Sequence, residues 1–219
     1  MADGDSSDAP PAGDGAGIAR TALLIDWGGV LTSNLFTSFH AYCLAAEIEP
    51  EKLMGRFRRD PEARELLIAL EKGELEEHDF EVAFAKLLEV EPDGLIDGLF
   101  AGVQPDEAMV QAVRMAHAGG VRTALVSNSW GVHRYPHDLF DELFDGVVIS
   151  GEEGMRKPAP EMYTLGAQRV GLAPAECVYV DDLSFNLTPA AELGMATVHH
   201  TASAVTIPQV AALLGVDLS

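Results

Sequence analysis

Short runs of apolar residues recur along the chain, and in its second half each run is followed by residues with helical spacing. The apolar runs lie at residues 18–25, 121–126, 146–150, 177–180 and 196–199. Helical spacing is found at residues 105–119, 160–170, 186–193 and 207–214. Buried strands that alternate with amphipathic helices are typical of a parallel sheet with helices on both faces. The pattern therefore predicts a three-layer α/β/α fold of the Rossmann-like kind.

Between the first and the second predicted strand, the hydrophobic pattern is helical throughout. Leu35, Phe39 and Cys43, and later Phe80 and Phe84, recur at steps of three or four residues. Helix-breaking positions lie at Pro50, Asp60–Pro61, Gly73 and residues 92–94. The interval predicts about four short helices, inserted as a cap domain at residues 34–103. The core domain is then formed by residues 18–33 and 104–219.

Residues 1–17 are rich in Asp, Ser, Ala, Pro and Gly and have almost nothing to bury, so we expect a disordered tail there. The 219 residues suffice for one domain with a sizeable insertion. No apolar run approaches the roughly 18 residues that span a bilayer, and the amino terminus has no signal-peptide pattern. We therefore expect a cytoplasmic protein without a membrane partner.

The chain is strongly acidic, with 35 Asp and Glu residues against 14 Lys and Arg residues and a net charge of −21. This charge repels polyanions and argues against nucleic acid as a partner. A small phosphorylated molecule is still compatible, because a metal ion or a few cations can reverse the field inside one cleft. No pattern specifies the oligomeric state.

Polar residues with catalytic chemistry follow several predicted strands. Asp26 ends the first strand, Ser127 the second, and Asp181–Asp182 the fourth. Asp26 alone could equally begin a turn, since Asp and Gly are common turn residues. The carboxyl ends of parallel strands converge on one crevice, however, and Lys157 precedes a helix in the same half of the chain. A nucleophilic carboxylate, further carboxylates for a divalent cation, a hydroxyl group and a lysine are what phosphoryl transfer requires.

Four stretches in this order resemble the motifs of the haloacid dehalogenase (HAD) superfamily, in the subfamily with a helical cap after the first strand. They are Asp26–Thr32, Leu125–Asn128, Arg156–Pro158 with Tyr163, and Val180–Asn186. The second half is most similar to the amino-terminal phosphatase domain of soluble epoxide hydrolases and to domains linked to acyl-CoA dehydrogenases. The resemblance covers about residues 22–201, and the cap and tail contribute little to it.

The resemblance implies a nucleophile and a metal site. Asp26 would be the nucleophile and a ligand of Mg²⁺, and the carbonyl group of Gly28 would be a second ligand. Asp182 would be the third ligand, and Asp181 and Asn186 would support the metal directly or through water.

The resemblance also implies that Ser127, Asn128 and Lys157 hold the phosphoryl group during its transfer. The family's phosphatases usually carry a second Asp, the general acid and base, two positions after the nucleophile, but that residue is Gly28 here. General acid–base catalysis typically contributes about 10² to 10⁴-fold, so alkyl phosphates should react slowly unless a cap residue or water substitutes. Trp130, which follows the second motif closely, could line the pocket or belong to the core.

Three functions are compatible with glycine at position 28. A phosphatase for good leaving groups, such as sugar 1-phosphates or acyl phosphates, needs the acid less. A 2-haloacid dehalogenase needs no acid, because halide leaves unprotonated, and a non-catalytic homologue would only bind phosphate or a partner. The dehalogenases need no metal, whereas the adjacent carboxylates Asp181–Asp182 are costly without a cation. The sequence thus favours a magnesium-dependent phosphatase that acts on a small phosphorylated metabolite through an aspartyl-phosphate.

Overall fold

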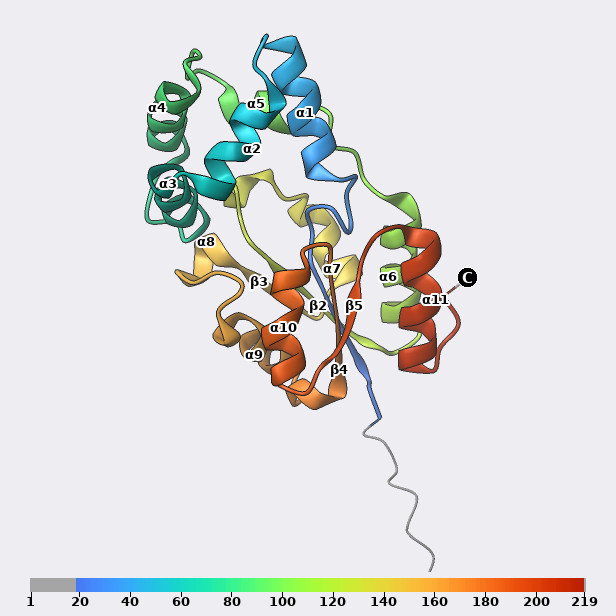
Figure 1. Cartoon of the computed structure of the whole chain (residues 1–219). Helices are drawn as coiled ribbons and strands as arrows, with labels where there is room; N and C mark the ends of the chain where they lie inside the picture. Colours follow the sequence, from blue (N-terminus) through green and yellow to red (C-terminus); the bar gives the residue numbers. More distant parts are fainter. Residues whose placement is uncertain (1–18, 219) are drawn as a thin grey trace, which may run out of the picture.

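Five parallel strands form one sheet, in the order β3-β2-β1-β4-β5. The computed structural model describes residues 19–218, so the tail predicted at residues 1–17 lies outside the described residues. The strands are β1 (Ala22–Ile25), β2 (Arg122–Ser127), β3 (Gly146–Ile149), β4 (Cys177–Asp181) and β5 (Ala196–His199). Helices lie on both sides of the sheet (Figure 1), which confirms the predicted three-layer α/β/α fold.

The strands are apolar along their length because both faces of the sheet are covered. In β1, Leu23 and Ile25 belong to the core on one face, whereas Ala22 and Leu24 belong to the core on the other. The sequence predicted a first strand from residue 18, which lies outside the described residues. Residues 19–21 are exposed or half-buried and outside the strand, so β1 begins at Ala22, the first buried residue. The first face is covered by α6 (Glu107–Ala118) and α11 (Ser203–Leu214), and the second by α9 (Pro160–Arg169) and α10 (Ser184–Glu192).

Several short elements have no counterpart in the sequence prediction. They are the helices α7 (Phe140–Leu143) and α8 (Ser150–Glu153) and three 3₁₀ turns at Val132–Arg134, His137–Leu139 and Pro174–Glu176. Elements of three or four residues end before a helical period can repeat, so periodicity does not reveal them. Two of the turns and α7 lie in the connection from β2 to β3, which contributes to the site described below.

The helices between β1 and α6 pack around their own apolar core, above the carboxyl ends of the strands (Figure 1). They are α1 (Leu35–Ala45), α2 (Pro50–Arg59), α3 (Pro61–Glu71), α4 (Glu77–Leu88) and α5 (Leu95–Phe100). The sequence predicted about four helices and missed α5, which has only six residues. Pro50 and Pro61, read as breaks, each begin a helix, as proline does readily at a first helical position. We call residues 34–103 the cap, with the boundaries proposed from the sequence.

The chain passes between core and cap twice, and the two passages lie side by side. Thr32 and Pro105 form an isolated antiparallel bridge. The backbone N–H of Ser33 donates to the carbonyl of Gln104 at 2.7 Å, and the N–H of Gln104 donates to Ser33 Oγ at 3.1 Å. These bonds fix the position of the cap's entry relative to its exit.

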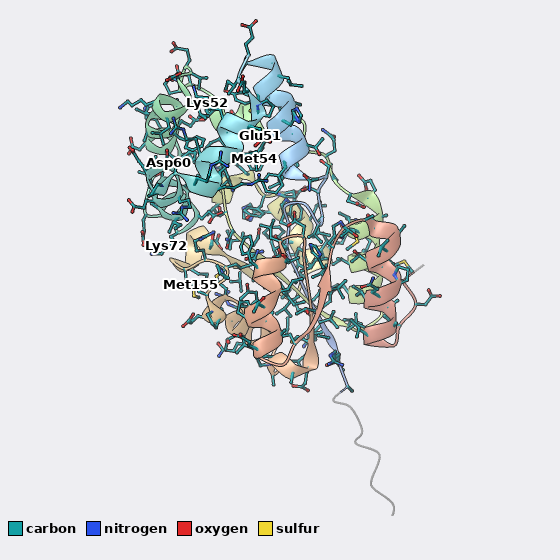
Figure 2. All side chains as sticks on the ribbon, viewed as in Figure 1. Glu51, Lys52, Met54, Asp60, Lys72 and Met155 are labelled. Carbon is teal, nitrogen blue, oxygen red and sulfur yellow. The ribbon has the colours of Figure 1, made fainter. Side chains whose placement is uncertain are left out.

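Charged side chains cover the outside of both parts (Figure 2). Glu51, Lys52 and Asp60 lie on the outer helices of the cap, and Lys72 and Met155 lie where the cap meets the core in that view. No helix within residues 19–218 combines the length and the apolar character needed to cross a membrane.

Candidate active site

Side chains from three neighbouring strands meet at the carboxyl edge of the sheet, beneath the cap. Asp26 directly follows β1, Ser127 ends β2 and Asp181 ends β4. Strand β1 lies between β2 and β4, and its last residue, Ile25, pairs with Leu125 on one side and with Val180 on the other. Parallel pairing in this register brings residues that are distant in sequence to a single point.

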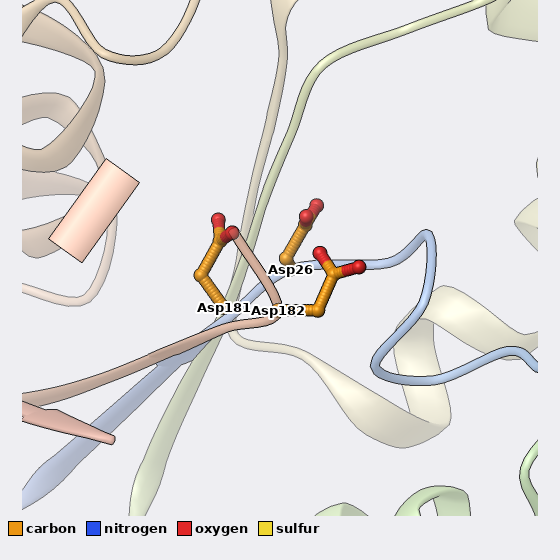
Figure 3. A group of neighbouring side chains, drawn as sticks. All are labelled: Asp26, Asp181 and Asp182. Atoms are coloured by element: carbon orange, nitrogen blue, oxygen red, sulfur yellow. The ribbon is translucent and has the colours of Figure 1, made fainter. Parts of the chain in front are cut away.

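Asp26, Asp181 and Asp182 form a cluster of three carboxylates (Figure 3). Each offers one oxygen atom, and these three atoms lie within 4.8 Å of one another. Asp26 and Asp181 are buried and Asp182 is half-buried. Oxygen ligands with negative charge suit a hard divalent cation. The residues present therefore fit the magnesium ion that the sequence resemblance implies.

The surroundings of these carboxylates shift their pKa values apart. Burial is the largest cause for Asp26, whose pKa rises to about 7, and for Asp182, whose pKa rises to about 6. Repulsion from Asp181 adds to both shifts, whereas the ammonium group of Lys157 opposes them. Burial is also the largest single cause for Asp181, but the charge of Lys157 and the hydrogen bonds from Lys157, Tyr179 and Leu183 together outweigh it, and the pKa of Asp181 is lowered. A divalent cation would relieve the remaining repulsion.

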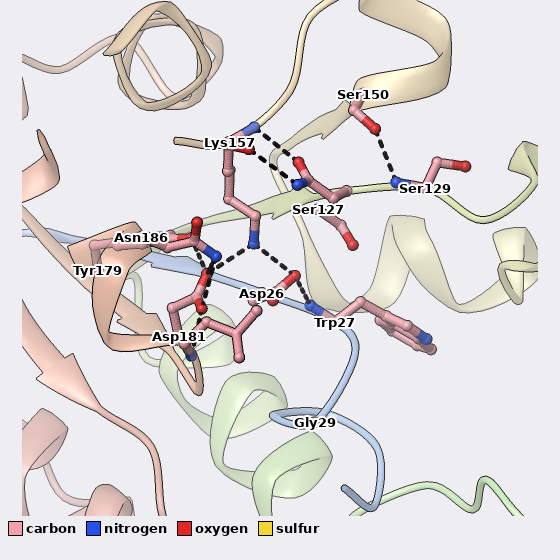
Figure 4. Close-up of polar contacts among 12 residues, drawn as sticks. Asp26, Trp27, Gly29, Ser127, Ser129, Ser150, Lys157, Tyr179, Asp181 and Asn186 are labelled. Carbon is pink, nitrogen blue, oxygen red and sulfur yellow. Dashed lines mark hydrogen bonds and ion pairs between the residues drawn. The ribbon is translucent and has the colours of Figure 1, made fainter. Parts of the chain in front are cut away.

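The ammonium group of Lys157 lies between Asp26 and Asp181 (Figure 4). Its Nζ atom lies 2.7 Å from Asp181 Oδ2 and 2.9 Å from Asp26 Oδ1, and its side chain is 1% exposed. Burial alone would lower the pKa of this ammonium group, but the two carboxylates raise it. Lys157 is therefore a fixed charge next to Asp26, at a place where it can also bind a phosphate oxygen.

Asp181 is held by several donors at once. Besides Lys157, it accepts hydrogen bonds from the backbone N–H of Leu183 at 2.8 Å, from the hydroxyl of Tyr179, and from Asn186 Nδ2 at 3.0 and 3.1 Å. With these bonds in place, Asp181 acts mainly as the anchor of Lys157. The amide oxygen of Asn186 has no hydrogen-bond partner in the part of the chain that the structure describes, so it can accept a bond from water.

Asp182 lies directly over Gly29, and no side chain within residues 19–218 donates a hydrogen bond to its carboxylate. A Cβ atom on Gly29 would lie 2.4 Å from Asp182 Oδ2, and Gly29 has a φ of +77°. Both the close approach and the left-handed backbone require glycine there. Asp182 is thus the carboxylate of the pair that is freer to bind a metal ion.

Ser127 and Asn128 are both fixed by neighbours. Ser127 Oγ accepts a hydrogen bond from the hydroxyl of Tyr135 at 2.9 Å. Asn128 is bonded to the backbone of Lys157, because its Oδ1 accepts from the N–H at 2.8 Å and its Nδ2 donates to the carbonyl at 3.1 Å. The amide side chain of Asn128 therefore positions the Lys157 segment, and only its backbone N–H is left to face a phosphate.

Gly28 is not required by its own backbone, since its φ lies outside the left-handed region. A Cβ atom added there would lie 2.9 Å from Cδ1 of Leu35, the first residue of α1. An apolar side chain of the cap therefore occupies the place where an acidic side chain would begin. The carbonyl of Gly28 accepts no hydrogen bond within residues 19–218 and is available as a metal ligand.

A buried glutamate of the cap also belongs to the site, and no pattern in the sequence points to it. Glu71, the last residue of α3, forms an ion pair with Arg156, and its carbonyl accepts from the hydroxyl of Ser150. Burial is the main reason why its pKa rises to about 7, against the opposing effect of Arg156. Glu71 Oε2 lies 3.5 Å from Asn128 Nδ2, so this contact links the cap to the segment that carries Lys157.

A cavity of about 560 Å³ opens between cap and core, beside Gly28 and Asn128. Its wall is largely apolar and includes the side chains of Trp27, Leu35, Phe100, Val103, Trp130 and Tyr135. Trp130 also packs against four phenylalanines of the cap at centroid distances of 5.5 to 5.8 Å. Trp130 therefore lines the cavity and also packs against the apolar core of the cap, so both roles considered from the sequence apply.

The Rossmann-like sheet, the inserted helices and the carboxylates at the strand ends define a hydrolase of the HAD type. Residues 21–194 match the family model of haloacid dehalogenase-like hydrolases. The chain belongs to this family, which confirms the resemblance inferred from the four motifs.

Known relatives include a phosphatase. A sesquiterpene phosphatase of Aspergillus oryzae is 32% identical over 117 residues, which are 52% of this chain and 59% of that protein. Acyl-CoA dehydrogenase family member 10 of Mus musculus is 28% identical over 214 residues, which are 92% of this chain. This chain spans only 20% of the length of the mouse protein.

Solved structures show the same fold. A HAD family enzyme of Bacteroides thetaiotaomicron, in complex with magnesium and inorganic phosphate, superposes with a TM-score of 0.61 at 21% identity. The superposition covers 84% of this chain and 96% of the bacterial one. At this identity the likeness establishes the arrangement of the helices and strands.

Proposed function

We propose that this protein is a magnesium-dependent phosphatase that hydrolyses a small phosphorylated molecule through an aspartyl-phosphate. The observation that carries the proposal is the cluster of Asp26, Asp181 and Asp182, the first two of which form ion pairs with Lys157. It offers one carboxylate as a nucleophile, further carboxylates for a cation, and one fixed ammonium group. The family and the sesquiterpene phosphatase among the relatives support the same reaction class.

In this reaction an oxygen atom of Asp26 attacks phosphorus, and the leaving-group oxygen departs with the electron pair of its bond. The ammonium group of Lys157, the hydroxyl of Ser127 and the backbone N–H of Asn128 bind the oxygens of the transferring phosphoryl group. Water then attacks the aspartyl-phosphate, which releases phosphate and restores the carboxylate of Asp26.

Four groups would hold the magnesium ion: Asp26, Asp182 and the carbonyl of Gly28 as ligands, and Asp181 in support. Bound there, the ion would neutralise the negative charges of the nucleophile and the phosphate. The raised pKa values of Asp26 and Asp182 mean that their negatively charged forms are disfavoured in this site, and a bound cation would stabilise those forms.

A second function, 2-haloacid dehalogenation, is favoured by the apolar contact of Gly28 with Leu35, because halide leaves without a proton. Against it stands the Asp181–Asp182 pair, whose repulsion a metal-free reaction would leave uncompensated. Phosphate binding without turnover is a third function that the same side chains could serve.

The test is hydrolysis of acetyl phosphate and 4-nitrophenyl phosphate by wild type and by Asp26→Asn, each with magnesium and with EDTA. Both leaving groups depart without a proton, so the absent acid does not mask a competent nucleophile. We expect release of phosphate that requires magnesium and disappears in Asp26→Asn.

Other outcomes assign the other functions. If neither ester is hydrolysed and 2-chloropropionate is converted in EDTA, the protein is a dehalogenase. If all three compounds are stable while phosphate raises the melting temperature, the site binds without catalysis.

A further inference from the structure

The cavity beside the active site is formed by aromatic and aliphatic side chains that come from both parts of the molecule. Trp27 and Tyr135 of the core meet edge to face, with ring centroids 6.0 Å apart. Leu35, Phe100 and Val103 of the cap also line it. Its volume of about 560 Å³ is typical of small-molecule sites. Because Gly28 and Asn128 line this space, the group bonded to a phosphate held at Asp26 would extend into it.

The charged residues of the cavity wall are already neutralised. Arg134 Nη2 lies 2.6 Å from Glu77 Oε2, and its Nη1 lies 2.6 Å from Asp97 Oδ1. His133 Nδ1 lies 3.0 Å from Glu77 Oε1. The Arg134 guanidinium thus faces two carboxylates of the cap, and the His133 ring faces one of them. Among the described residues that line the cavity, no cationic side chain is left unpaired for a second phosphate or a carboxylate of a ligand. An uncharged, apolar group fits this wall.

In the proposed complex, the leaving-group oxygen lies beside an apolar side chain, that of Leu35, and not beside a carboxylic acid. The space next to the Cα atom of Gly28 is filled by Leu35 Cδ1, 2.9 Å from where a Cβ atom would lie. A leaving group in this position must depart as an anion. Phenol-type anions, with a parent pKa of about 10 as in tyrosine, do so far more readily than alkoxides, whose parent alcohols are much weaker acids, comparable to water.

We propose that the substrate of the phosphatase is the phosphate monoester of an apolar, phenol-type alcohol, whose rings occupy the cavity between Trp27, Phe100, Val103 and Tyr135. This inference rests on the proposed function. The P–O bond to the ring oxygen breaks, the phenolate leaves with the electron pair, and it takes a proton from water after release. A second water molecule then attacks the phosphorus of the aspartyl-phosphate and the P–O bond to Asp26 breaks. One proton of this water stays on the released phosphate and the other goes to solvent.

The leaving-group experiment compares 2-naphthyl phosphate with 2-naphthylmethyl phosphate, which carry the same rings on a phenolic and an alkyl oxygen. We expect kcat/KM to be at least about 10²-fold higher for the phenolic ester. General acid catalysis typically contributes about 10² to 10⁴-fold, and the alkyl ester loses this contribution when the acid is absent. Acetyl phosphate, which has no ring, is measured in parallel with wild type and Asp26→Asn.

The acid can be restored as a further test. In the double variant Gly28→Asp/Leu35→Ala, the alanine makes room for a carboxyl group beside the leaving oxygen. We expect the ratio between the two naphthyl esters to fall at least tenfold relative to Leu35→Ala alone. The single variant is the control, because it opens the same space without adding an acid.

The fit of the rings is tested with phenyl and 2-naphthyl phosphate, whose leaving groups are chemically alike. We expect a KM about tenfold lower for the larger ester, as burial of the added ring predicts. Val103→Trp should remove this advantage by filling the cavity. The same substitution at Val205, 48% exposed on α11, should preserve it.

The outcomes separate the two proposals. If acetyl phosphate is hydrolysed and depends on Asp26, while both naphthyl esters react equally or glucose 6-phosphate reacts faster than 2-naphthyl phosphate, the substrate class is wrong and the phosphatase stands. If Asp26 is not required for hydrolysis of acetyl phosphate, or nothing is hydrolysed, the phosphatase proposal fails and the substrate class fails with it.

Discussion

In the proposed reaction, the active site has a phosphate end and a leaving-group end, and the two are built by different physical means. At the phosphate end, each polar group has a specific partner: Lys157 bridges two carboxylates, and Asn128 holds the backbone of Lys157. At the leaving-group end, the wall consists of side chains such as Phe100 and Val103 that pack without directional bonds. Directional bonds fix one geometry, whereas apolar packing accepts different shapes of similar volume.

This difference has a kinetic consequence. A change at the phosphate end alters a part that every substrate shares, so it should lower the rates of all substrates by the same factor. A change at the leaving-group end should alter the ratios between substrates. Measurements with acetyl phosphate, which has no ring, and with 2-naphthyl phosphate distinguish the two kinds of effect.

The largest expected effect is that of Lys157→Met. Without the ammonium group, Asp26 and Asp181 repel each other in a buried site and the phosphate oxygens lose a donor, so kcat should fall about 10³-fold. The fall should be equal for acetyl phosphate and 2-naphthyl phosphate. Lys86→Met, at an exposed position of α4, is the control, and a thermal melt verifies that each variant is folded. Unequal losses would show that the two ends are not separate.

Tyr135→Phe tests whether the two ends of the site act separately, because the hydroxyl of Tyr135 belongs to the phosphate end and its ring to the leaving-group end. Its hydroxyl donates to Ser127 Oγ at 2.9 Å, while its ring lines the cavity. Phenylalanine keeps the ring, so we expect kcat to fall about tenfold for both substrates with an unchanged ratio between them. Tyr42→Phe in the cap serves as the matched control. A changed substrate ratio in Tyr135→Phe would contradict the assignment of the hydroxyl to the phosphate end.

Glu71→Gln tests the contact between cap and phosphate end. The carboxylate pairs with Arg156 only when it is ionised, and its pKa is raised to about 7, so the pair weakens as the pH falls through 7. We expect KM of the wild type to rise severalfold between pH 8 and pH 6. The variant should have the higher KM at both pH values, and the difference between the two proteins should shrink at pH 6.

The control for this measurement is Glu65→Gln, at an exposed position of the same helix, which should follow the wild type. Comparing proteins at each pH cancels the titration of Asp26, which they share. A ratio of KM values that stays constant with pH would exclude a role for the ionised form of Glu71.

The smallest effect concerns stability. The folded-state pKa of Asp182, about 6, exceeds its ordinary value of 3.8, so the folded state binds more protons and loses stability as the pH rises between these values. At pH 7.5, Asp182→Asn should therefore melt a few degrees above the metal-free wild type, and the difference should vanish near pH 4. Magnesium should stabilise the wild type and leave the variant unchanged. A variant less stable at pH 7.5 would contradict the repulsion inferred from burial.

The strands and the meeting point of Asp26, Ser127 and Asp181 could be predicted from the sequence. Apolar runs identify buried strands, and in a parallel sheet the residues after neighbouring strands necessarily meet at one edge. The helical character of the cap was also predictable from periodicity, although α5 was too short to show one.

The contacts of Glu71, Tyr135 and Asn128 could not be predicted. The contacts of Glu71 depend on how α3 packs against the core. Tyr135 follows a 3₁₀ turn in the connection from β2 to β3, which has no periodic pattern in the sequence. For Asn128 the motif identified the residue, but the atoms that face Lys157 depend on three-dimensional packing. The filling of the space beside Gly28 by Leu35 likewise became visible only in the structure.

The paired passages at Ser33 and Gln104 make the cap a replaceable module. Because the two connecting segments are hydrogen-bonded to each other, a cut at both positions leaves two chain ends only about 5 Å apart. Any helical insert whose own termini are close could be joined there without lengthening β1 or moving Asp26. New substrate ranges could then be generated by recombining whole caps with one unchanged catalytic core, rather than by accumulating single substitutions.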